Sequence, residues 1–445
     1  MEWPKSDEKA RLITAKKPRT RTESVMLTSS KSRHPALLLA TLLFVSFCSA
    51  VCYSLIAPFF PKLAVTKGGS QALASWVFGS YELVAFLVCP IFGRHISKIG
   101  PRFVFVSGIA VTGVACGLFG LLSIVQSYES FVALAFAIRI VEAVGAGAYL
   151  TASYYIAASE FPDHVATVQG FISTASGIGI STGPAVGGAL FTAGGYYLPF
   201  VVMGVVLVLA AGLSYCVYRP VEIPDKKTFH GSYIDLLMTP SILCAGLSVM
   251  CGAVSIGFFE PSLELHIDHL VGSPFQVGLV FLASAGTFAL SSPIWGWAGD
   301  HMQMPKILMT IGAVIVGVSY ILMGPAPFLH WKLQLWMVIV ALLIQGIGLG
   351  GLLVPPLKDA INAAIKKGYP NNLETRGLLS GLFASLFSLG AFLGPVVGGS
   401  LIDVISFDWT AVIIAGLNFF VAGLLMFYLV AQKRIESALT VIDFS

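Results

Sequence analysis

Four ionisable residues stand inside long apolar stretches of the sequence, where charges are otherwise rare. Glu82, Glu142 and Glu260 are flanked on both sides by apolar residues, and Arg139 precedes Glu142 by three positions. Charged side chains in such surroundings are costly, and they mark substrate, ion or proton pathways. A carboxyl group in a low-dielectric cavity holds either a proton or a cation. The residues therefore predict a site that exchanges protons for cations.

Purely structural roles are the alternatives for these residues. Glu82 and Glu142 each lie eleven residues inside an apolar stretch, roughly 16 Å along a helix and near the middle of a bilayer. Glu142 and Arg139 share one helical face and could simply neutralise each other. Glu82 could form a polar bond between helices. Glu260 precedes Pro261 and could mark a kinked helix end.

Aromatic and hydroxyl side chains near these charges are the second group of candidates. Aromatic rings attract cations through their π faces, and a polyamine with several ammonium groups fits scattered acids better than a monoamine does. Packing remains the alternative role for each ring. The candidates for contact with a cationic substrate are Tyr53, Ser54, Tyr81, Tyr149 and Phe259.

The elements that must position these residues are membrane-spanning helices. The chain has 445 residues, of which 56% are hydrophobic and only 11% are charged, against about 25% charged in soluble domains. A span needs roughly 20 apolar residues, and the backbone must be helical to satisfy its polar groups in lipid. Twelve blocks qualify: 36–60, 75–95, 103–125, 131–156, 165–192, 196–217, 240–262, 275–299, 305–324, 333–356, 377–402 and 409–431.

The distribution of Lys and Arg predicts the orientation of these helices. With both termini in the cytosol, 22 of the 26 Lys and Arg residues fall on the cytosolic side, as the positive-inside rule requires. The resulting order is a disordered basic leader, a six-helix half, a cytosolic linker, a second six-helix half and a cytosolic tail. Their ranges are 1–35, 36–217, 218–239, 240–432 and 433–445.

A glycine-proline motif occurs twice, 211 residues apart. Small residues at this spacing let a neighbouring helix approach closely, and the proline bends the helix. Close packing alone explains one copy, but the identical spacing in both copies indicates an internal repeat. The first copy comprises Gly179, Gly183, Pro184, Gly187 and Gly188, and the second comprises Gly390, Gly394, Pro395, Gly398 and Gly399.

A second motif also repeats, at an offset of 203 residues. It follows the second and the eighth apolar block, and its members are Gly93, Lys98 and Arg102 in one copy and Gly296 and Asp300 in the other. Two unrelated motifs with nearly the same offset predict two homologous halves.

The motifs resemble those of the major facilitator superfamily. The glycine-proline copy in helix five is similar to the signature of its proton-coupled antiporters, and the resemblance covers residues 36 to 432. It implies an all-α integral membrane fold of twelve helices in two six-helix halves that work by alternating access. The family's loop motif carries an Asp that helps close a cytoplasmic gate. That Asp is Asp300 here, while Ser97 replaces it in the first half. Arg139, Glu142 and Gly145 resemble the family's Arg-centred motif, implicated in proton transfer.

Finer detail resembles the vesicular amine transporter family, and most of all its polyamine branch. The segments that carry the resemblance are 52–61, 259–263, 278–282 and 291–293. The monoamine and acetylcholine branches have acids in helices one, ten and eleven, which this chain lacks. The resemblance thus implies a proton/polyamine antiporter that loads acidic vesicles. A monoamine or cationic-drug antiporter, and a non-transporting receptor or scaffold, are the alternatives.

Other functional classes are not favoured. No nucleophile–base pair or phosphate-binding loop is visible, and no Cys/His spacing suggests a metal, so we expect no enzyme, no cofactor and no metal. The modest net charge of +4 sits mostly in the leader and suggests lipid contact and not nucleic acid. We expect a monomer in a secretory or synaptic vesicle membrane, with the plasma membrane as an alternative.

Overall fold

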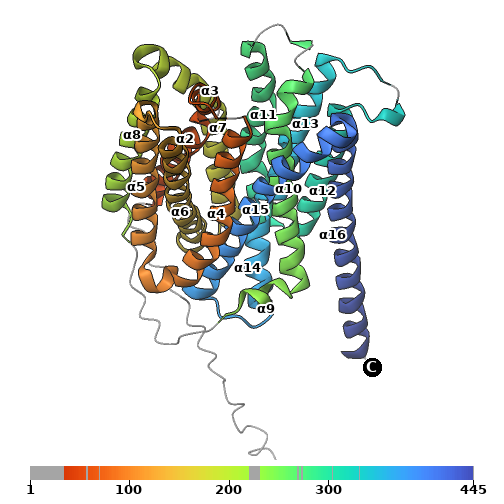
Figure 1. The fold of residues 1–445 in the computed structure, drawn as a ribbon. Helices are drawn as coiled ribbons and strands as arrows, with labels where there is room; N and C mark the ends of the chain where they lie inside the picture. Colours follow the sequence, from red (N-terminus) through yellow and green to blue (C-terminus); the bar gives the residue numbers. More distant parts are fainter. Residues whose placement is uncertain are drawn as a thin grey trace, which may run out of the picture.

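The computed structural model describes residues 35–56, 59–69, 71–219, 231–267, 270–271, 274–302, 304–329 and 331–443. In these ranges the chain is helical, with short 3-10 turns and no strand. Figure 1 shows two groups of helices side by side, α2 to α8 in one and α10 to α16 in the other. The predicted leader falls almost wholly outside the described residues.

The first group contains six long helices and one short one. The first predicted block reaches two helices, because α2 ends at Leu55 and a separate short helix starts at Phe60. The helices are α2 (Pro35–Leu55), α3 (Phe60–Thr66), α4 (Gln71–Ile99), α5 (Pro101–Gly120), α6 (Tyr128–Glu160), α7 (Val165–Gly194) and α8 (Tyr197–Val217).

The second group repeats this plan. The tenth predicted block divides at Val354 and Pro355, since successive prolines cannot continue the hydrogen-bond ladder, and α14 begins with Pro356 at its first turn. The helices are α10 (Pro240–Ile267), α11 (Pro274–His301), α12 (Pro305–Met323), α13 (Leu335–Leu353), α14 (Pro356–Lys366), α15 (Leu373–Ile405) and α16 (Phe407–Asp443).

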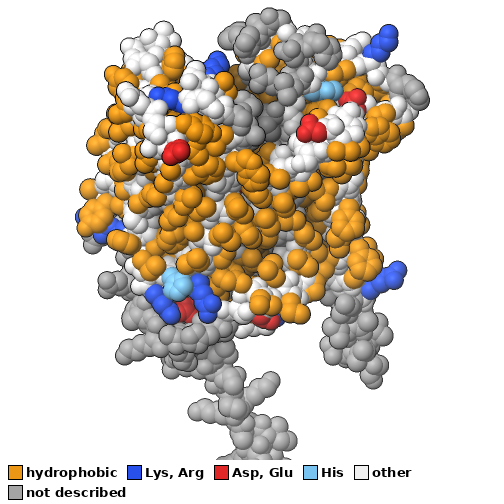
Figure 2. Space-filling model, in the orientation of Figure 1, with side chains coloured by type: hydrophobic (Ala, Val, Ile, Leu, Met, Phe, Trp, Pro, Cys, Tyr) orange, Lys and Arg blue, Asp and Glu red, His pale blue; other side chains and the backbone are white. Residues whose placement is uncertain are grey.

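Most of these helices are suited to a bilayer. In the part of the chain that is described, eleven helices are long and apolar enough to cross a membrane. The twelfth long helix, α7, is rich in Gly, Ser and Thr and packs between α2 and α11. Figure 2 shows a broad apolar surface around the middle of the molecule, with charged side chains mostly toward its two ends. The fold is therefore that of a multi-pass membrane protein.

The linker between the two groups ends in a short helix, α9 (Tyr233–Leu237), at the end of the bundle that also carries α14 (Figure 1). We call this the linker end, and the end with α3 the opposite end. Asp235 accepts hydrogen bonds from Lys367, at 2.6 Å, and from the Tyr369 hydroxyl, and these bonds hold the pKa of its carboxyl below the usual value. The Tyr233 hydroxyl donates to the Pro90 carbonyl of α4 at 2.5 Å, so α9 is tied to both groups.

Candidate functional site

Arg139 and Glu142 form an ion pair inside the first group. The Arg139 Nη1 lies 2.8 Å from the Glu142 Oε2, and the two side chains are 0% and 1% exposed. Both project from α6, one helical turn apart, so the helix itself sets their geometry. The two charges are therefore paired in this structure, whichever of the roles left open by the sequence they serve. Glu142 is thus not an uncompensated acid.

The aromatic candidates surround Arg139. Its guanidinium carbon lies 4.3 Å from the ring centre of Tyr81 and 5.8 Å from those of Tyr53 and Phe78. Tyr149 packs against the same cluster. In this structure the rings of Tyr53 and Tyr81, predicted from the sequence to contact a substrate cation, lie beside the protein's own cation, Arg139.

Glu82 is the buried acid without a cationic partner. Its side chain is 8% exposed, and among the described residues no Lys, Arg or His lies within ion-pair distance of it. The carboxyl group lies within hydrogen-bonding reach of the Ser388 hydroxyl on α15 and the Tyr53 hydroxyl on α2. Because α4 and α15 belong to different groups, Glu82 stands at the seam between the two halves of the molecule.

The other candidates near the seam differ in how far the structure describes them. The Glu260 side chain lies outside the described residues. Phe259, next to it on α10, is buried and stacks on Phe281 of α11 with ring centres 5.6 Å apart. Ser54 on α2 is buried and faces the glycine motif of α7, where a Cβ on Gly183 would overlap its hydroxyl.

The glycine-proline motif brings helices together in the same way in both halves. In α7 its glycines pack on α2, with a Cβ at Gly179 only 2.5 Å from the Phe47 carbonyl oxygen. In α15 they pack on α10, with a Cβ at Gly394 only 2.6 Å from the Val254 carbonyl oxygen. Gly188 and Gly399, the last residue of each copy, face open space. The motif thus serves packing within each half.

The gate motif behaves differently in its two copies. In the second, the Asp300 carboxylate caps α7 across the seam, accepting from the backbone N–H groups of Ala166 at 3.0 Å and Thr167 at 2.8 Å. An anion at a helix N-terminus also benefits from the helix dipole. In the first copy, Arg102 donates to the Tyr215 carbonyl within its own half.

The remaining members of the gate motif are small or exposed. Lys98 is exposed at the end of α4. The two halves meet at two seams, one between α4 and α15 and one between α7 and α11. Gly93 allows a close backbone contact with Gly377 across the first, and Gly296 allows one with Ala166 across the second. The two halves are therefore held together at the linker end.

Two of the Lys and Arg residues expected on the cytosolic side also act at this end. Lys358 donates to the Pro162 carbonyl at 2.8 Å, and Arg376 donates to the Ala158 carbonyl near the end of α6. A cation suits the Ala158 carbonyl in particular, because the last carbonyls of a helix carry partial negative charge. Together with Asp300, they clamp both sides of the α6–α7 connection to the second half.

Sequence reasoning missed a second buried ion pair. Lys306, one of the 22 Lys and Arg residues expected on the cytosolic side, is 5% exposed and pairs with Asp359 of α14. It also donates to the Ser241 hydroxyl at 2.7 Å. The prolines that open α12 and α14 were the available signal, because they place both residues in first helical turns. The pair joins three elements within the second half.

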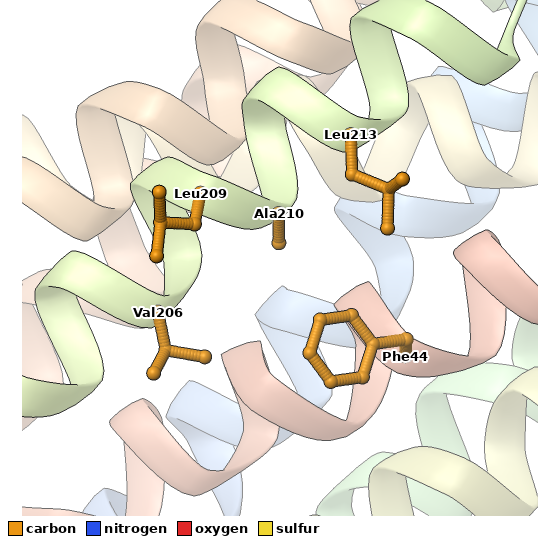
Figure 3. A pocket seen from close by; sticks show the side chains of 5 residues that line it. All are labelled: Phe44, Val206, Leu209, Ala210 and Leu213. Carbon is orange, nitrogen blue, oxygen red and sulfur yellow. The ribbon is translucent and has the colours of Figure 1, made fainter.

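The cavity drawn in Figure 3 does not offer a cation site. It has a volume of about 270 Å³ and lies on the lateral surface between α2 and α8. Phe44, Val206, Leu209, Ala210 and Leu213 line it, so only apolar groups face it. Among the described residues there is also no group of three His, Cys, Asp or Glu side chains that could hold a metal.

Two six-helix halves joined by a linker, with buried charges at their seam, define a membrane transporter fold. The Major Facilitator Superfamily model matches residues 42–232 and 242–440, and the chain belongs to this superfamily. It is 37% identical to the MFS-type transporter SLC18B1 of Homo sapiens over 409 residues, or 91% of this chain and 88% of that protein. The superfamily predicted from the motifs is confirmed, and the chain is a membrane transporter and not an enzyme.

More distant similarities agree with this assignment. The Synaptic vesicular amine transporter of Homo sapiens is 22% identical over 357 residues, which cover 79% of this chain and 65% of that protein. The crystal structure of the human organic anion transporter MFSD10 (TETRAN) has a TM-score of 0.70 at 16% identity, covering 87% of this chain and 99% of that one. At this identity the second similarity shows the fold alone. The first confirms the predicted resemblance to vesicular amine transporters.

Proposed function

We propose that this transporter exchanges protons for polyamines, such as spermidine and spermine, or for related organic cations, by alternating access. The observation that carries the proposal is Glu82, a buried carboxyl group with no cationic partner among the described residues, at the seam between the halves. A buried carboxylate without a counter-ion is costly, so the group holds either a proton or an ammonium ion. Exchange at one such group is antiport.

The orientation and location follow from charge and from the chemistry of exchange. We place the linker end in the cytosol, because 22 of the 26 Lys and Arg residues then lie on the cytosolic side. Uptake against a concentration gradient needs an acidic compartment opposite, as in a secretory or synaptic vesicle. Each chain contains both halves, which supports a monomer as the working unit.

A monoamine or a cationic drug is the second candidate substrate. It is favoured by the same geometry, since Glu142 is neutralised by Arg139 and leaves Glu82 as the one uncompensated acid among the described buried residues. A single carboxylate matches a single ammonium group. Glu260, which we propose as a further contact, would favour a substrate with two or more charges.

The test is uptake of radiolabelled spermidine by purified protein in liposomes with an acidic lumen, with and without a protonophore. We expect uptake that collapses with the proton gradient. Glu82→Gln should reduce it about 10- to 100-fold, the usual weight of a hydrogen bond to a charged group. Glu129→Gln, which changes an exposed acid at the start of α6, is the matched control and should leave uptake intact.

Three other outcomes would redirect the proposal. Gradient-driven uptake of serotonin or a cationic dye without spermidine uptake would indicate an amine or drug antiporter. Unchanged uptake by Glu82→Gln would remove Glu82 from the exchange. Absence of substrate-dependent proton flux with every cation would indicate a receptor or scaffold of the same fold.

A further inference from the structure

Four prolines lie inside the helices that meet at the seams, one each in α4, α7, α11 and α15, and two of them free a backbone carbonyl that the other half satisfies. Pro90 is in the middle of α4 and Pro293 is in α11. A proline has no N–H, so the carbonyl four residues earlier loses its helical donor. The two carbonyls concerned belong to Phe86 and Ala289. In a buried, apolar setting an unpaired carbonyl is unfavourable and needs another partner.

Each of these carbonyls is satisfied by a hydroxyl from the other half. The Ser385 hydroxyl of α15 donates to the Phe86 carbonyl at 2.8 Å. The Thr174 hydroxyl of α7 donates to the Ala289 carbonyl at 2.7 Å. Ser385 is 3% exposed, so water does not compete for its bond. Each contact therefore has two parts. A proline leaves a carbonyl without its helical donor, and a hydroxyl of the other half donates to that carbonyl.

The two contacts are related by the internal repeat. Pro90 and Pro293 are 203 residues apart, the offset of the gate motif, and Thr174 and Ser385 are 211 apart, the offset of the glycine-proline motif. The same bond thus occurs once in each seam, at equivalent positions. Two matching bonds are harder to attribute to chance packing than one.

In each seam the bond lies between a stretch where the two backbones touch and a stretch where aromatic rings lie between the helices. On the linker side the backbones touch, because a Cβ on Gly93 would lie 2.6 Å from the Gly377 carbonyl and one on Gly170 2.5 Å from the Ser292 carbonyl. On the other side aromatic rings separate the helices, Phe392 beside Gly79 in one seam and Phe288 beside Gly177 in the other.

We infer that the Ser385–Phe86 and Thr174–Ala289 hydrogen bonds are the pivot about which the two halves rotate. Two fixed contacts on opposite seams define an axis through the middle of the molecule. Rotation about that axis opens the backbone contacts at the linker end while the two bonds persist. Ser385 and Thr174 are positioning residues in this account. The inference rests on the proposed function only in that the halves must move.

One seam differs from the other in a way that bears on coupling. Glu82 and Ser388 lie one turn from the Ser385 bond, and the repeat offsets place Ala285 and Gly177 at the equivalent points of the second seam. Among these described, equivalent positions, only the α4–α15 seam therefore has an ionisable group beside its pivot. Binding of a proton or an ammonium ion at Glu82 acts directly on that seam. The α7–α11 seam provides the second fixed point of the rotation.

A double-mutant cycle tests the proline–hydroxyl pairing without any substrate. Ser385→Ala should lower the melting temperature by about 2 °C in the wild-type background. In a Pro90→Ala background, where an N–H again reaches the Phe86 carbonyl, the loss should fall below half of that. Thr174→Val with Pro293→Ala should behave alike. Equal losses in both backgrounds would overturn the pairing.

Conservative and matched variants control for general effects of substitution on folding. Thr174→Ser and Ser385→Thr keep the hydroxyl and should retain wild-type stability. Ser400→Ala removes a hydroxyl from the same helix as Ser385, but one that bonds its own helix at Val396 and is exposed, so it should have no effect. A loss as large at Ser400 as at Ser385 would contradict the inference.

Spin-label distances test the pivot itself. Cys216 is the exposed cysteine among the described residues, so labels are introduced in a Cys216→Ser background. Label pairs join α7 to α11 at three heights: His164 with Met302 at the linker end, Ile178 with Leu290 beside the pivot, and Phe191 with Gln276 at the opposite end. All six positions are exposed.

The distance distribution should be narrow beside the pivot and broad at both ends in liposomes, whatever the ligand. Thr174→Val should broaden the pivot pair at least about twofold, while Thr174→Ser should not. Equal widths at the three heights would show that the bonds are not a pivot, even if transport of spermidine is established. Conversely, a narrow pivot pair without spermidine uptake would leave the inference standing and remove the proposed substrate.

Discussion

At the scale of single residues, Arg139 is a buried cation whose charge needs stabilisation from its neighbours. Its guanidinium is fully buried and bonds one carboxylate, while its Nε and Nη2 have no hydrogen-bond partner among the described residues. Three rings around it supply the remaining stabilisation. Desolvating both charges offsets much of their attraction, so such a pair contributes less to stability than its geometry suggests.

Removing one member of this pair should cost more than removing both. Arg139→Gln leaves Glu142 as an uncompensated buried charge, and we expect a loss of about 3–5 kcal/mol in the free energy of unfolding. The double variant Arg139→Met with Glu142→Gln should recover most of that loss. Thermal unfolding in detergent, followed by fluorescence, measures both. A double variant no more stable than Arg139→Gln would show that the pair does more than neutralise itself.

At the scale of elements, the glycine-proline motif controls how closely helices pack within a half. Its glycines are not equivalent, because Gly183 meets Ser54 of α2 while Gly188 meets nothing within 4 Å. The second half repeats the contrast between Gly394 and Gly399. In the sequence pattern these four glycines are equivalent, and only the neighbouring helix distinguishes them.

Alanine substitutions should reveal this contrast. Gly183→Ala places a methyl group against the Ser54 side chain, and Gly394→Ala places one against the backbone of α10. We expect each to cost about 1–3 kcal/mol of unfolding free energy. Gly188→Ala and Gly399→Ala should be neutral, or stabilising by up to about 1 kcal/mol, because alanine is the better helix former. Chemical denaturation of the four variants checks the pattern. Similar losses at all four positions would contradict the packing described here.

At the scale of the whole molecule, the two halves are clamped at the linker end by charges that meet helix ends. Asp300 caps α7, Arg376 donates to the Ala158 carbonyl near the end of α6, and Lys358 donates to the Pro162 carbonyl just after that helix. All three belong to the second half and all three act on one connection of the first. The clamp is thus one-sided, in agreement with Ser97 standing where the other half would need an acid.

Weakening the clamp should open the linker end. Asp300→Asn replaces two charge-assisted bonds with weaker ones, and we expect a shift of about 1.5–3 kcal/mol toward the linker-end-open state. The distance between spin labels at His164 and Met302 should lengthen accordingly. Asp403→Asn, an exposed acid at the other end of α15, is the control. An unchanged distance would mean that the backbone contacts alone keep this end closed.

Much of the architecture could be predicted from the sequence because it depends on local patterns. The length of an apolar block determines whether a helix can cross a membrane, and all twelve blocks contain a long helix. The spacing of glycines, prolines and charges revealed the repeat and the superfamily. The errors were local as well: the first and tenth blocks each run into a second, separate helix, and the last helix continues to Asp443.

The partners of the functional candidates were decided only by the tertiary structure. Glu82 meets Ser388, Arg139 meets Tyr81, and Ser385 meets the Phe86 carbonyl. Two of these three contacts join residues about 300 positions apart, across a seam whose register no local pattern specifies. Composition and periodicity determine what a helix can do in a membrane, because they act within one helix. Which acid is neutralised and which hydroxyl fills a freed carbonyl depends on how two folded halves dock.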